Sequence, residues 1–316
     1  MGDATHWREQ REGGGRFALW LIVVLALRGG RRFARLLLYP ITLYFFLRRG
    51  TERRASRQYL ARAFGRPPGV WAMLRQFHGY AATTLDRIFL LARGERGFHI
   101  EVEGLDELER HLDEGHGVLL VGSHQGSFEA LRAVSARRSG TQLRVVLDKG
   151  KTPAMTALLE ALAPAVGESV IDAAQGGANV VLAAAEACRQ GAMVALLADR
   201  AGEREAQREV DFLGAPAPLP VGPWLLASAL KVPVLLCFGL YLGGNRYRLV
   251  FEPFAERVEI PRDCRGPALD ALLARYAARL EHYVRLAPYN WFNFHEFWRR
   301  PATPGIASSP EHRRAG

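Results

Sequence analysis

The sequence predicts an α/β fold: a mostly parallel central sheet flanked by helices on both faces, with a further helical segment at the N-terminus. From residue 98 onward, short apolar segments alternate with segments whose apolar residues recur at helical spacing. Residues 117–122 read GVLLVG, and a run without polar side chains is typical of a strand covered on both faces. A chain of 316 residues with 49% hydrophobic and 23% charged residues can bury a core of this kind.

The elements follow in order along the chain. Residues 51–66 are basic and compatible with a helix, Pro67, Pro68 and Gly69 interrupt it, and residues 70–91 have helical spacing. Strands are expected at 98–102, 117–122, 142–147, 168–171, 192–198, 232–238 and 247–252, and helices at 105–113, 127–138, 152–162, 178–190, 221–230 and 267–286. Chemistry in such folds gathers at the carboxyl ends of the strands, so functional residues are expected after Gly122, Leu147, Ala198 and Phe238.

The positive charge is concentrated at the N-terminus. The chain has a net charge of +10, and residues 1–66 hold fourteen Arg and no Lys against four acidic residues. The rest of the chain is therefore neutral, which argues against a nucleic-acid-binding body and predicts no nucleic-acid partner. We divide the chain into a basic leader (1–66), an α/β domain (67–300) and a disordered tail (301–316).

The leader contains two apolar runs, 17–27 and 33–47, separated by Arg28, Arg31 and Arg32. An 11-residue helix is only about 16 Å long, whereas a bilayer core needs about 20 residues. A cleaved signal peptide and a buried pair of soluble helices are two interpretations. The favoured one is a monotopic, membrane-associated anchor, whose aromatic residues enter one leaflet while Arg side chains bind anionic headgroups. Arg on both flanks favours the cytoplasmic leaflet.

Neither a disulfide framework nor a metal site is expected. Cys188, Cys237 and Cys264 are widely spaced, odd in number and without a CxxC motif, which is typical of buried reduced cysteines. His295 and Glu296 have no further ligand at a suitable spacing.

His124 and Glu129 are the candidate catalytic pair. They follow the strand at 117–122 and are five positions apart, so on a regular helix they would lie about 140° apart and could not meet. They can meet if His124 lies on a turn, which Gly126 permits, and Glu129 lies in the first turn of a helix with Ser127 as its N-cap. Glu129 would then orient one ring nitrogen, leaving the other to act as a base.

No enzyme nucleophile is evident, because Ser123 falls one place early for a GxSxG elbow. Direct transfer to a substrate hydroxyl is the better interpretation, with the amides of the helix N-terminus stabilising an oxyanion. The alternative is a turn histidine and a solvated helix acid.

The His124-x4-Glu129 motif after a strand resembles that of the lysophospholipid and glycerolipid acyltransferase superfamily, and specifically its bacterial lipid A late acyltransferase branch. The basic leader with Pro40, Asp199-Arg200 at a strand end, the Phe-Leu-Gly turn at 212–214 and Gly222-Pro223 at a helix start are similar to features of that family. Val232-Pro233-Val234 matches its late strand. The resemblance covers roughly residues 7–298.

This resemblance implies acyl transfer from an acyl thioester, usually on acyl carrier protein or else on coenzyme A, to a hydroxyl of a membrane lipid at the cytoplasmic face of the inner membrane. It implies no cofactor beyond that co-substrate. His124 would be the general base and Glu129 its orienting partner. The candidate substrate-binding residues are Ser123, Gly126, Lys149, Lys151, Asp199, Arg200, Gly222 and Pro223.

Two segments depart from the family pattern. Lys149 and Lys151 stand where an Arg is common, and they could contact a phosphate or an acidic carrier protein. The aromatic C-terminus at 288–298 resembles a divergent branch that includes members of aryl-polyene-type pigment pathways. It could line an acyl channel, rest on the bilayer or pack on the core.

Three alternative functions stay open. The first is an acyl-CoA-dependent lysophospholipid or pigment-lipid acyltransferase. The second is a non-catalytic module that binds membrane lipid or carrier protein. The third is a lipid hydrolase that uses the same histidine on water.

Overall fold

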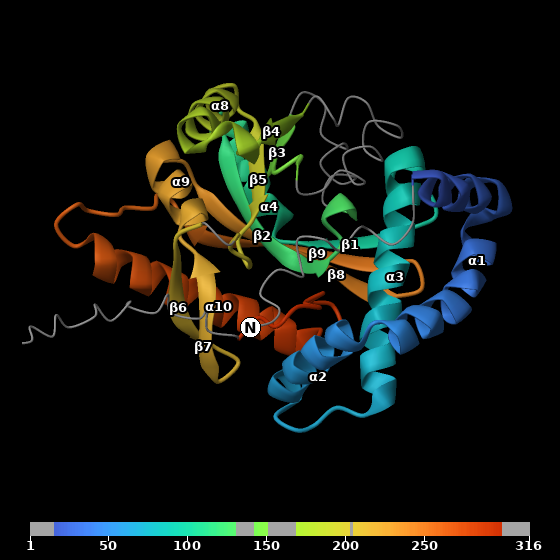
Figure 1. Ribbon diagram of the computed structural model, residues 1–316. Coiled ribbons are helices and arrows are strands. Elements are labelled where there is room, and N and C mark those ends of the chain that lie inside the picture. Colours follow the sequence, from blue (N-terminus) through green and yellow to red (C-terminus); the bar gives the residue numbers. More distant parts are fainter. Residues whose placement is uncertain (1–15, 131–141, 151–168, 203–204, 299–316) are drawn as a thin grey trace, which may run out of the picture.

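The computed structural model describes residues 16–130, 142–150, 169–202 and 205–298, with side chains from residue 28 onward (Figure 1). A seven-stranded sheet with the order β1-β9-β8-β2-β5-β3-β4 forms its centre. All neighbouring pairs in it are parallel except β8 and β9. The strands are β1 (His99–Glu103), β2 (Val118–Gly126), β3 (Leu143–Leu147), β4 (Val170–Asp172), β5 (Met193–Leu197), β8 (Val234–Gly243) and β9 (Arg246–Ala255).

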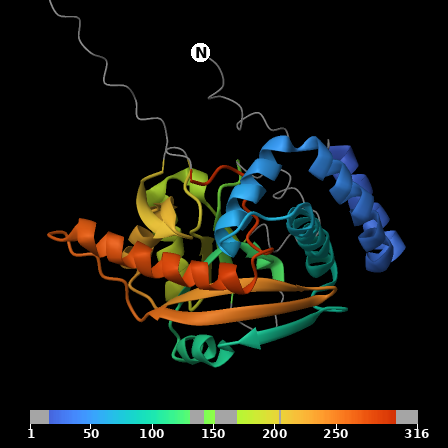
Figure 2. The same ribbon diagram turned by 90° about the horizontal axis from the view of Figure 1, so that it is seen from below.

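Helices cover both faces of this sheet, as predicted. The larger core lies under one face, where Leu119 and Val121 of β2 meet five helices: α2 (Gly50–Phe64), α3 (Val70–Arg93), α8 (Gly177–Arg189), α9 (Gly222–Leu230) and α10 (Arg265–Leu286). The alternate residues Val118 and Leu120 face a smaller core with α4 (Leu105–Asp113). Figure 2 shows α4 below the sheet and α10 above it. Successive side chains of β2 point to opposite faces of the sheet, and both faces are covered by helices. A strand that is apolar at every position therefore lies in the centre of the sheet, as expected.

The predicted elements in the described ranges are present, and a hairpin was missed. A short 3-10 helix, η1 (Ala173–Gln175), follows β4. The missed hairpin pairs β6 (Gln207–Phe212) with β7 (Ala215–Pro220) in a separate two-stranded sheet. Its turn is Leu213-Gly214, and both residues have positive φ, 53° and 72°, as a type I′ turn requires. This strand was not predicted because β7 has proline at every second position. Proline is tolerated here because both strands of a two-stranded sheet are edge strands. The helix expected at 152–162 lies outside the described residues, and so do residues 131–138 of the helix expected at 127–138, whose residues 128–130 are helical.

Residues 16–48 of the leader form the helix α1 (Arg16–Arg48), which lies along the outside of α3 (Figures 1 and 2). It is kinked at Gly30, where φ is 78°, at the break between the two apolar runs. Ala34 and Leu38 pack against α3, while the opposite side of the helix is exposed. Among the described residues, no helix has the length and apolar content needed to cross a membrane.

Two arginines of the leader form ion pairs with a buried aspartate of the body. Asp86 of α3 is fully buried and accepts hydrogen bonds from Arg31 at 2.7 and 2.9 Å and from Arg35 at 2.7 Å. The hydroxyl of Tyr247 on β9 donates to the same carboxylate at 2.7 Å. Arg31 and Arg35 therefore fasten α1 to the body, so part of the basic charge expected to contact headgroups is neutralised internally.

We expect Asp86→Ala to lower the free energy of unfolding by about 3–5 kcal/mol, because it leaves two guanidinium groups without their buried partner. The matched control is Asp270→Ala, which removes the exposed partner of Arg208 and should cost at most about 1 kcal/mol. Urea unfolding monitored by circular dichroism measures both changes. Equal losses in the two variants would contradict this account.

The helix α2 packs on the body, although its charge belongs to the leader. Tyr59 and Leu60 are fully buried in the larger core, and the Tyr59 hydroxyl donates to the carbonyl of Pro288 at 2.5 Å. Residue 66 thus marks a change in charge. It does not mark a change in packing, because residues of α2 share the larger core with the domain that follows.

Candidate active site

His124 is placed by a bulge in the central sheet. The strand β2 continues beyond Gly122 to Gly126, so His124 lies on the strand and not on a turn after it. Between Gly122 and Gly126 the register with β8 shifts, because these residues oppose only Cys237 to Gly239. The two strands pair again at Gly126 and Gly239, so the extra residues of β2 form a bulge between these two paired points. Bulges of this kind re-aim a side chain next to a functional site, and here the His124 side chain is 40% exposed.

Ser127 is the N-cap that the sequence predicted, whereas Gly126, expected to permit a turn at His124, is the last residue of β2. Gly126 has a φ of 66°, and a Cβ there would lie 1.7 Å from the carbonyl oxygen of Gly239, so only glycine fits. A helix begins at Phe128. Ser127 caps it, because the Ser127 hydroxyl accepts a hydrogen bond from the backbone N–H of Ala130 at 3.3 Å.

The carboxylate beside His124 belongs to Asp199, two residues after β5. Asp199 Oδ1 lies 2.8 Å from His124 Nδ1 and accepts the backbone N–H of His124 at 3.1 Å. Asp199 Oδ2 accepts the indole N–H of Trp291 at 2.8 Å. The carboxylate is fully buried. His124 Nε2 has no hydrogen-bond partner in the described part of the chain, so this nitrogen can accept a proton when Nδ1 carries one.

The expectation that Glu129 orients His124 is therefore corrected. Glu129 pairs with Arg87 of α3, with 2.8 Å between Oε1 and Nε, and it is buried. The reason is the continuation of β2: His124 lies on the strand and Glu129 on the next helix, where α3 reaches it. The carboxylate in contact with the His124 ring is that of Asp199, which was predicted to bind substrate.

Burial and neighbouring charges shift the pKa values of both His124 and Asp199. Desolvation by the surrounding protein lowers the pKa of His124 below its usual value, and the charges of Arg200 and Arg87 lower it further, against the opposing effect of Asp199. Burial alone would raise the pKa of Asp199. The hydrogen bond from His124, the Arg200 charge and the Trp291 hydrogen bond outweigh it, so the pKa lies well below its usual range. His124 is thus kept neutral and Asp199 ionised near pH 7.

Arg200 lies next to this pair and faces the C-terminal segment. Its Nε is 3.8 Å from Asp199 Oδ2, and its guanidinium donates to the carbonyl of Phe292. Its side chain is 25% exposed. A cation with partial access beside His124 can contact an anionic or polar group of a substrate.

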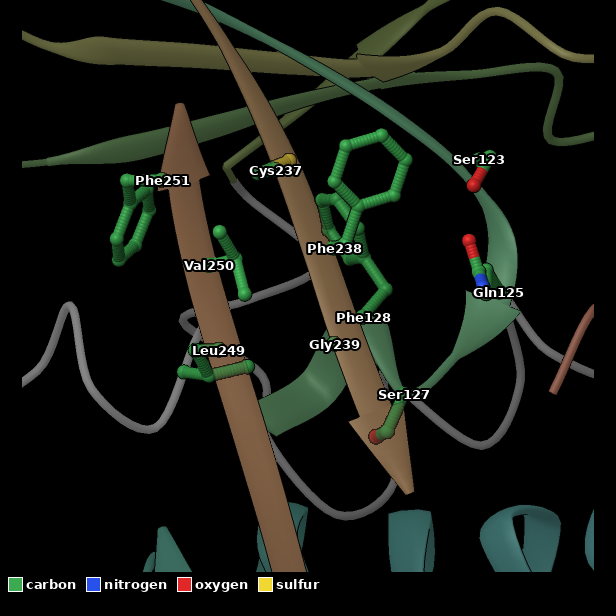
Figure 3. A pocket seen from close by; sticks show the side chains of 10 residues that line it. All are labelled: Ser123, Gln125, Ser127, Phe128, Cys237, Phe238, Gly239, Leu249, Val250 and Phe251. Atoms are coloured by element: carbon green, nitrogen blue, oxygen red, sulfur yellow. The ribbon is translucent and has the colours of Figure 1, made fainter. Parts of the chain in front are cut away.

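Ser123 is directed elsewhere. Its side chain lines a cavity of about 10 Å³ together with Gln125, and the hydroxyl of Ser123 and the amide oxygen of Gln125 point toward one another (Figure 3). His124 does not line this cavity. A space of this size holds at most about one water molecule, so it offers no room for a lipid substrate.

Three of the remaining predicted binding residues, Lys149, Gly222 and Pro223, lie in the described part of the chain. Lys149 follows β3, which is separated from β2 by β5, and its backbone N–H donates to Asp172 at 3.3 Å. Lys151 lies outside the described residues. Gly222 and Pro223 begin α9, where Pro fits the first turn. Their binding roles stay predictions.

A histidine and glutamate cluster lies on and directly after α4 and includes Glu256, which follows β9. Potential ligand atoms of His111, Glu114 and His116 are within 4.8 Å of one another, and so are those of Glu107, His111 and Glu256. The guanidinium of Arg110 pairs with all three glutamates and lies 3.1 Å from His111 Nε2. Its charge opposes a metal cation, so we assign no metal to the cluster.

Sequence reasoning missed Arg87 and Trp291. Arg87 lies in the predicted helix at 70–91, in which no charged residue was singled out. Trp291 lies in the aromatic C-terminal stretch, for which packing on the core was one expectation. Only the rule that adjacent parallel strands end at one edge could have joined His124 to Asp199, because β2 and β5 are neighbours in the sheet.

The fold and this edge define an α/β protein with an enzyme-like histidine–carboxylate pair beside a partly exposed arginine. Residues 9–300 match the family model described as bacterial lipid A biosynthesis acyltransferase, and the chain belongs to that family. It is 25% identical over 282 residues to a phosphatidylinositol mannoside acyltransferase of Mycobacterium tuberculosis strain H37Rv, covering 86% of this chain and 82% of the relative. The protein of that name from strain CDC 1551 is 24% identical over 278 residues, with the same coverage. The chain is an acyltransferase of lipid biosynthesis, as predicted.

Proposed function

We propose that this protein transfers a fatty acyl group from an acyl thioester to a hydroxyl of a membrane glycolipid, with His124 as general base. The observation that carries the proposal is the His124–Asp199 pair, in which Nδ1 is held at 2.8 Å and the ring stays 40% exposed. An imidazole held in this way presents Nε2 to a hydroxyl.

The proposed reaction has no acyl-enzyme. His124 Nε2 takes the proton of the acceptor hydroxyl as its oxygen attacks the thioester carbonyl carbon. A C–O bond forms and the carbonyl oxygen becomes an oxyanion. Collapse of this intermediate breaks the C–S bond, and the leaving thiolate takes the proton from His124, which restores the neutral base.

Glu129 and the two arginines would support this step indirectly. Glu129 holds Arg87 through the 2.8 Å ion pair, and both Arg87 and Arg200 lower the pKa of His124. Both side chains are partly exposed, 26% for Arg87 and 25% for Arg200. Arg200 is the better placed to contact the oxyanion or an acceptor phosphate, because its Nε lies 3.8 Å from Asp199 Oδ2, beside the proposed base. Glu129 is thus proposed as a positioning residue for Arg87, and its carboxylate is expected to be needed for full activity.

The substrates are inferred from chemistry and from the relatives. The two mycobacterial proteins are named for a phosphatidylinositol mannoside, a glycolipid, which supports a glycolipid hydroxyl as acceptor. Lys149 lies two positions after the end of β3, a parallel strand of the same sheet, and Lys151 comes two positions later in the sequence. Two such cations fit an acidic carrier protein, so acyl carrier protein is the proposed donor and acyl-CoA the alternative.

The proposed location is the cytoplasmic face of the inner membrane. Along the exposed side of α1, large apolar side chains recur over three helical turns and include Leu36, Tyr39, Leu43 and Leu47, which are 49–66% exposed. Exposed Arg28, Arg32 and Arg48 flank this stripe. An apolar stripe with flanking arginines is typical of a helix that lies in an anionic membrane surface.

We expect the double variant Leu36→Asp/Leu43→Asp to lose most of its co-sedimentation with phosphatidylglycerol-containing vesicles. The control is Leu182→Asp on α8, since Leu182 is 68% exposed and far from the stripe in sequence. Unchanged sedimentation of the double variant, or full-length wild type that stays in the supernatant, would contradict membrane docking by α1.

The proposed reaction is tested with purified full-length protein in detergent. Palmitoyl-acyl carrier protein and palmitoyl-CoA serve as donors, and phosphatidylinositol mannoside, a lipid A precursor and a lysophospholipid serve as acceptors, with mass spectrometry of the lipid products. Acceptor-dependent ester formation supports the proposal. Free fatty acid formed without acceptor indicates a hydrolase, and lipid binding without turnover indicates a binding module.

The pH dependence follows from the lowered pKa of His124. A base must be neutral to accept a proton, and a pKa below the usual 6.5 keeps it neutral at lower pH. We expect the acidic limb of kcat/KM to have its midpoint below pH 6.5. Steady-state rates between pH 4.5 and 9 (about 10 points) measure it. A midpoint above the ordinary histidine value would contradict this electrostatic account.

A further inference from the structure

Trp291 lies in the C-terminal segment that passes beside the candidate base. The backbone carbonyl of Asn290 accepts the backbone N–H of Gly126 at 2.9 Å, and the backbone N–H of Phe292 donates to the backbone carbonyl of His124 at 3.0 Å. Trp291 therefore runs antiparallel to the bulged end of β2, next to Gln125. Backbone hydrogen bonds thus hold this segment against the bulge that carries His124.

The indole ring is held on every side. Trp291 is fully buried, and its ring packs against those of Tyr59, Phe212 and Phe297 with centroid distances of 4.9, 5.3 and 5.1 Å. Its carbonyl accepts the side-chain amide of Gln76 at 2.9 Å. A side chain packed in this way places its N–H donor with little freedom.

That donor meets the carboxylate that holds His124. Trp291 Nε1 donates to Asp199 Oδ2 at 2.8 Å, on the oxygen opposite the one that contacts His124 Nδ1. With both oxygens engaged, the carboxylate has one rotational setting, and that setting fixes the ring of His124. Outer hydrogen bonds that orient a reacting group commonly change activity by about 10–100-fold when removed.

We propose that Trp291 is a positioning residue for acyl transfer: its indole N–H fixes the Asp199 carboxylate and thereby orients His124. This rests on the function proposed above, in which His124 is the base. Trp291 itself touches neither substrate nor the reacting atoms.

The test compares Trp291→Phe with Trp298→Phe in the full-length enzyme. Trp298 is the matched control, because it stacks on the same Phe212 and donates its indole N–H to the Phe212 carbonyl at 3.3 Å, away from Asp199. We expect Trp291→Phe to lower kcat by about 10–100-fold with an unchanged KM for the acyl donor, and Trp298→Phe to leave kcat within about 3-fold of wild type.

A pH profile separates positioning from packing. A lost hydrogen bond makes the Asp199 carboxylate more basic, which stabilises the protonated form of His124. The acidic limb of kcat/KM should therefore move to higher pH in Trp291→Phe. The other charged or titratable groups around the pair, Arg87, Arg200, Tyr276 and His295, are unchanged in the variant.

Two further measurements keep the proposal testable if the smaller ring disturbs folding. Benzothienylalanine at position 291 keeps the bicyclic ring and replaces the N–H by sulfur, and it should reproduce the loss in kcat. In an Asp199→Asn background, Trp291→Phe should cause no further loss. Wild-type activity of the benzothienyl enzyme, or additive losses in the double variant, would overturn the proposal. Absence of transfer by wild type would instead refute the proposed function.

Discussion

His124→Ala is expected to lower kcat for acyl transfer by about 10²–10⁴-fold, which is the usual contribution of a positioned general base. The reason is the site geometry: Nδ1 is engaged by Asp199 at 2.8 Å, and Nε2 is the nitrogen left to take the hydroxyl proton. Alanine removes the base and leaves the strand intact, because the backbone N–H of His124 still donates to Asp199. Initial rates with palmitoyl-acyl carrier protein and a saturating acceptor measure the effect.

The control for this variant is His282→Ala, which removes an exposed histidine of α10. It should keep wild-type kcat. Far-ultraviolet circular dichroism and thermal melting should show His124→Ala to be folded, since the side chain is 40% exposed and carries little of the core. Full activity in folded His124→Ala would refute the general-base mechanism.

Asp199→Asn is the second large expected effect. Asparagine has nearly the same shape, so the packing around position 199 and the hydrogen bond from Trp291 can persist. The negative charge is lost, however, and the amide can donate to Nδ1, which leaves Nε2 protonated and unable to act as a base. We expect kcat to fall by about 10²–10⁴-fold with a KM close to wild type, because the defect is in proton transfer.

This variant also separates the two carboxylates. Glu129→Gln disturbs the ion pair with Arg87 and leaves the His124–Asp199 contact in place. If Asp199 orients the base, Asp199→Asn should have the larger effect on kcat at pH 7, and Glu129→Gln the smaller one. Near-wild-type kcat in Asp199→Asn, with a large loss in Glu129→Gln, would restore Glu129 as the orienting partner.

Much of the fold could be predicted because strands and helices leave local patterns. The helix at 105–113 matches α4, and the apolar run at 117–122 is the start of the central strand β2. Ser127 was assigned correctly as an N-cap, since a cap depends on the residue and its neighbours, whereas the turn expected at His124 proved to be the end of β2. The hairpin of β6 and β7 was missed because its alternating prolines obscure the pattern of a strand.

The candidate site was predicted only in part, because one of its two residues has a local sequence signal and the other does not. The position of His124 at the end of a central strand follows from the sequence alone. Its partner does not, because Glu129 is five positions away whereas Asp199 is 75 positions away in the chain. The bulge at 122–126 decided between them, and no local periodicity reveals a bulge.

The sequence by itself determined the α/β class, the separation of a basic leader from a neutral body, and the placement of a histidine at a strand end. Tertiary structure alone decided which charges meet: Asp199 with His124, Arg87 with Glu129, and Arg31 and Arg35 with Asp86. The physical reason is range. Hydrophobic periodicity acts between neighbours in sequence, whereas an ion pair depends on which strands and helices become neighbours in space.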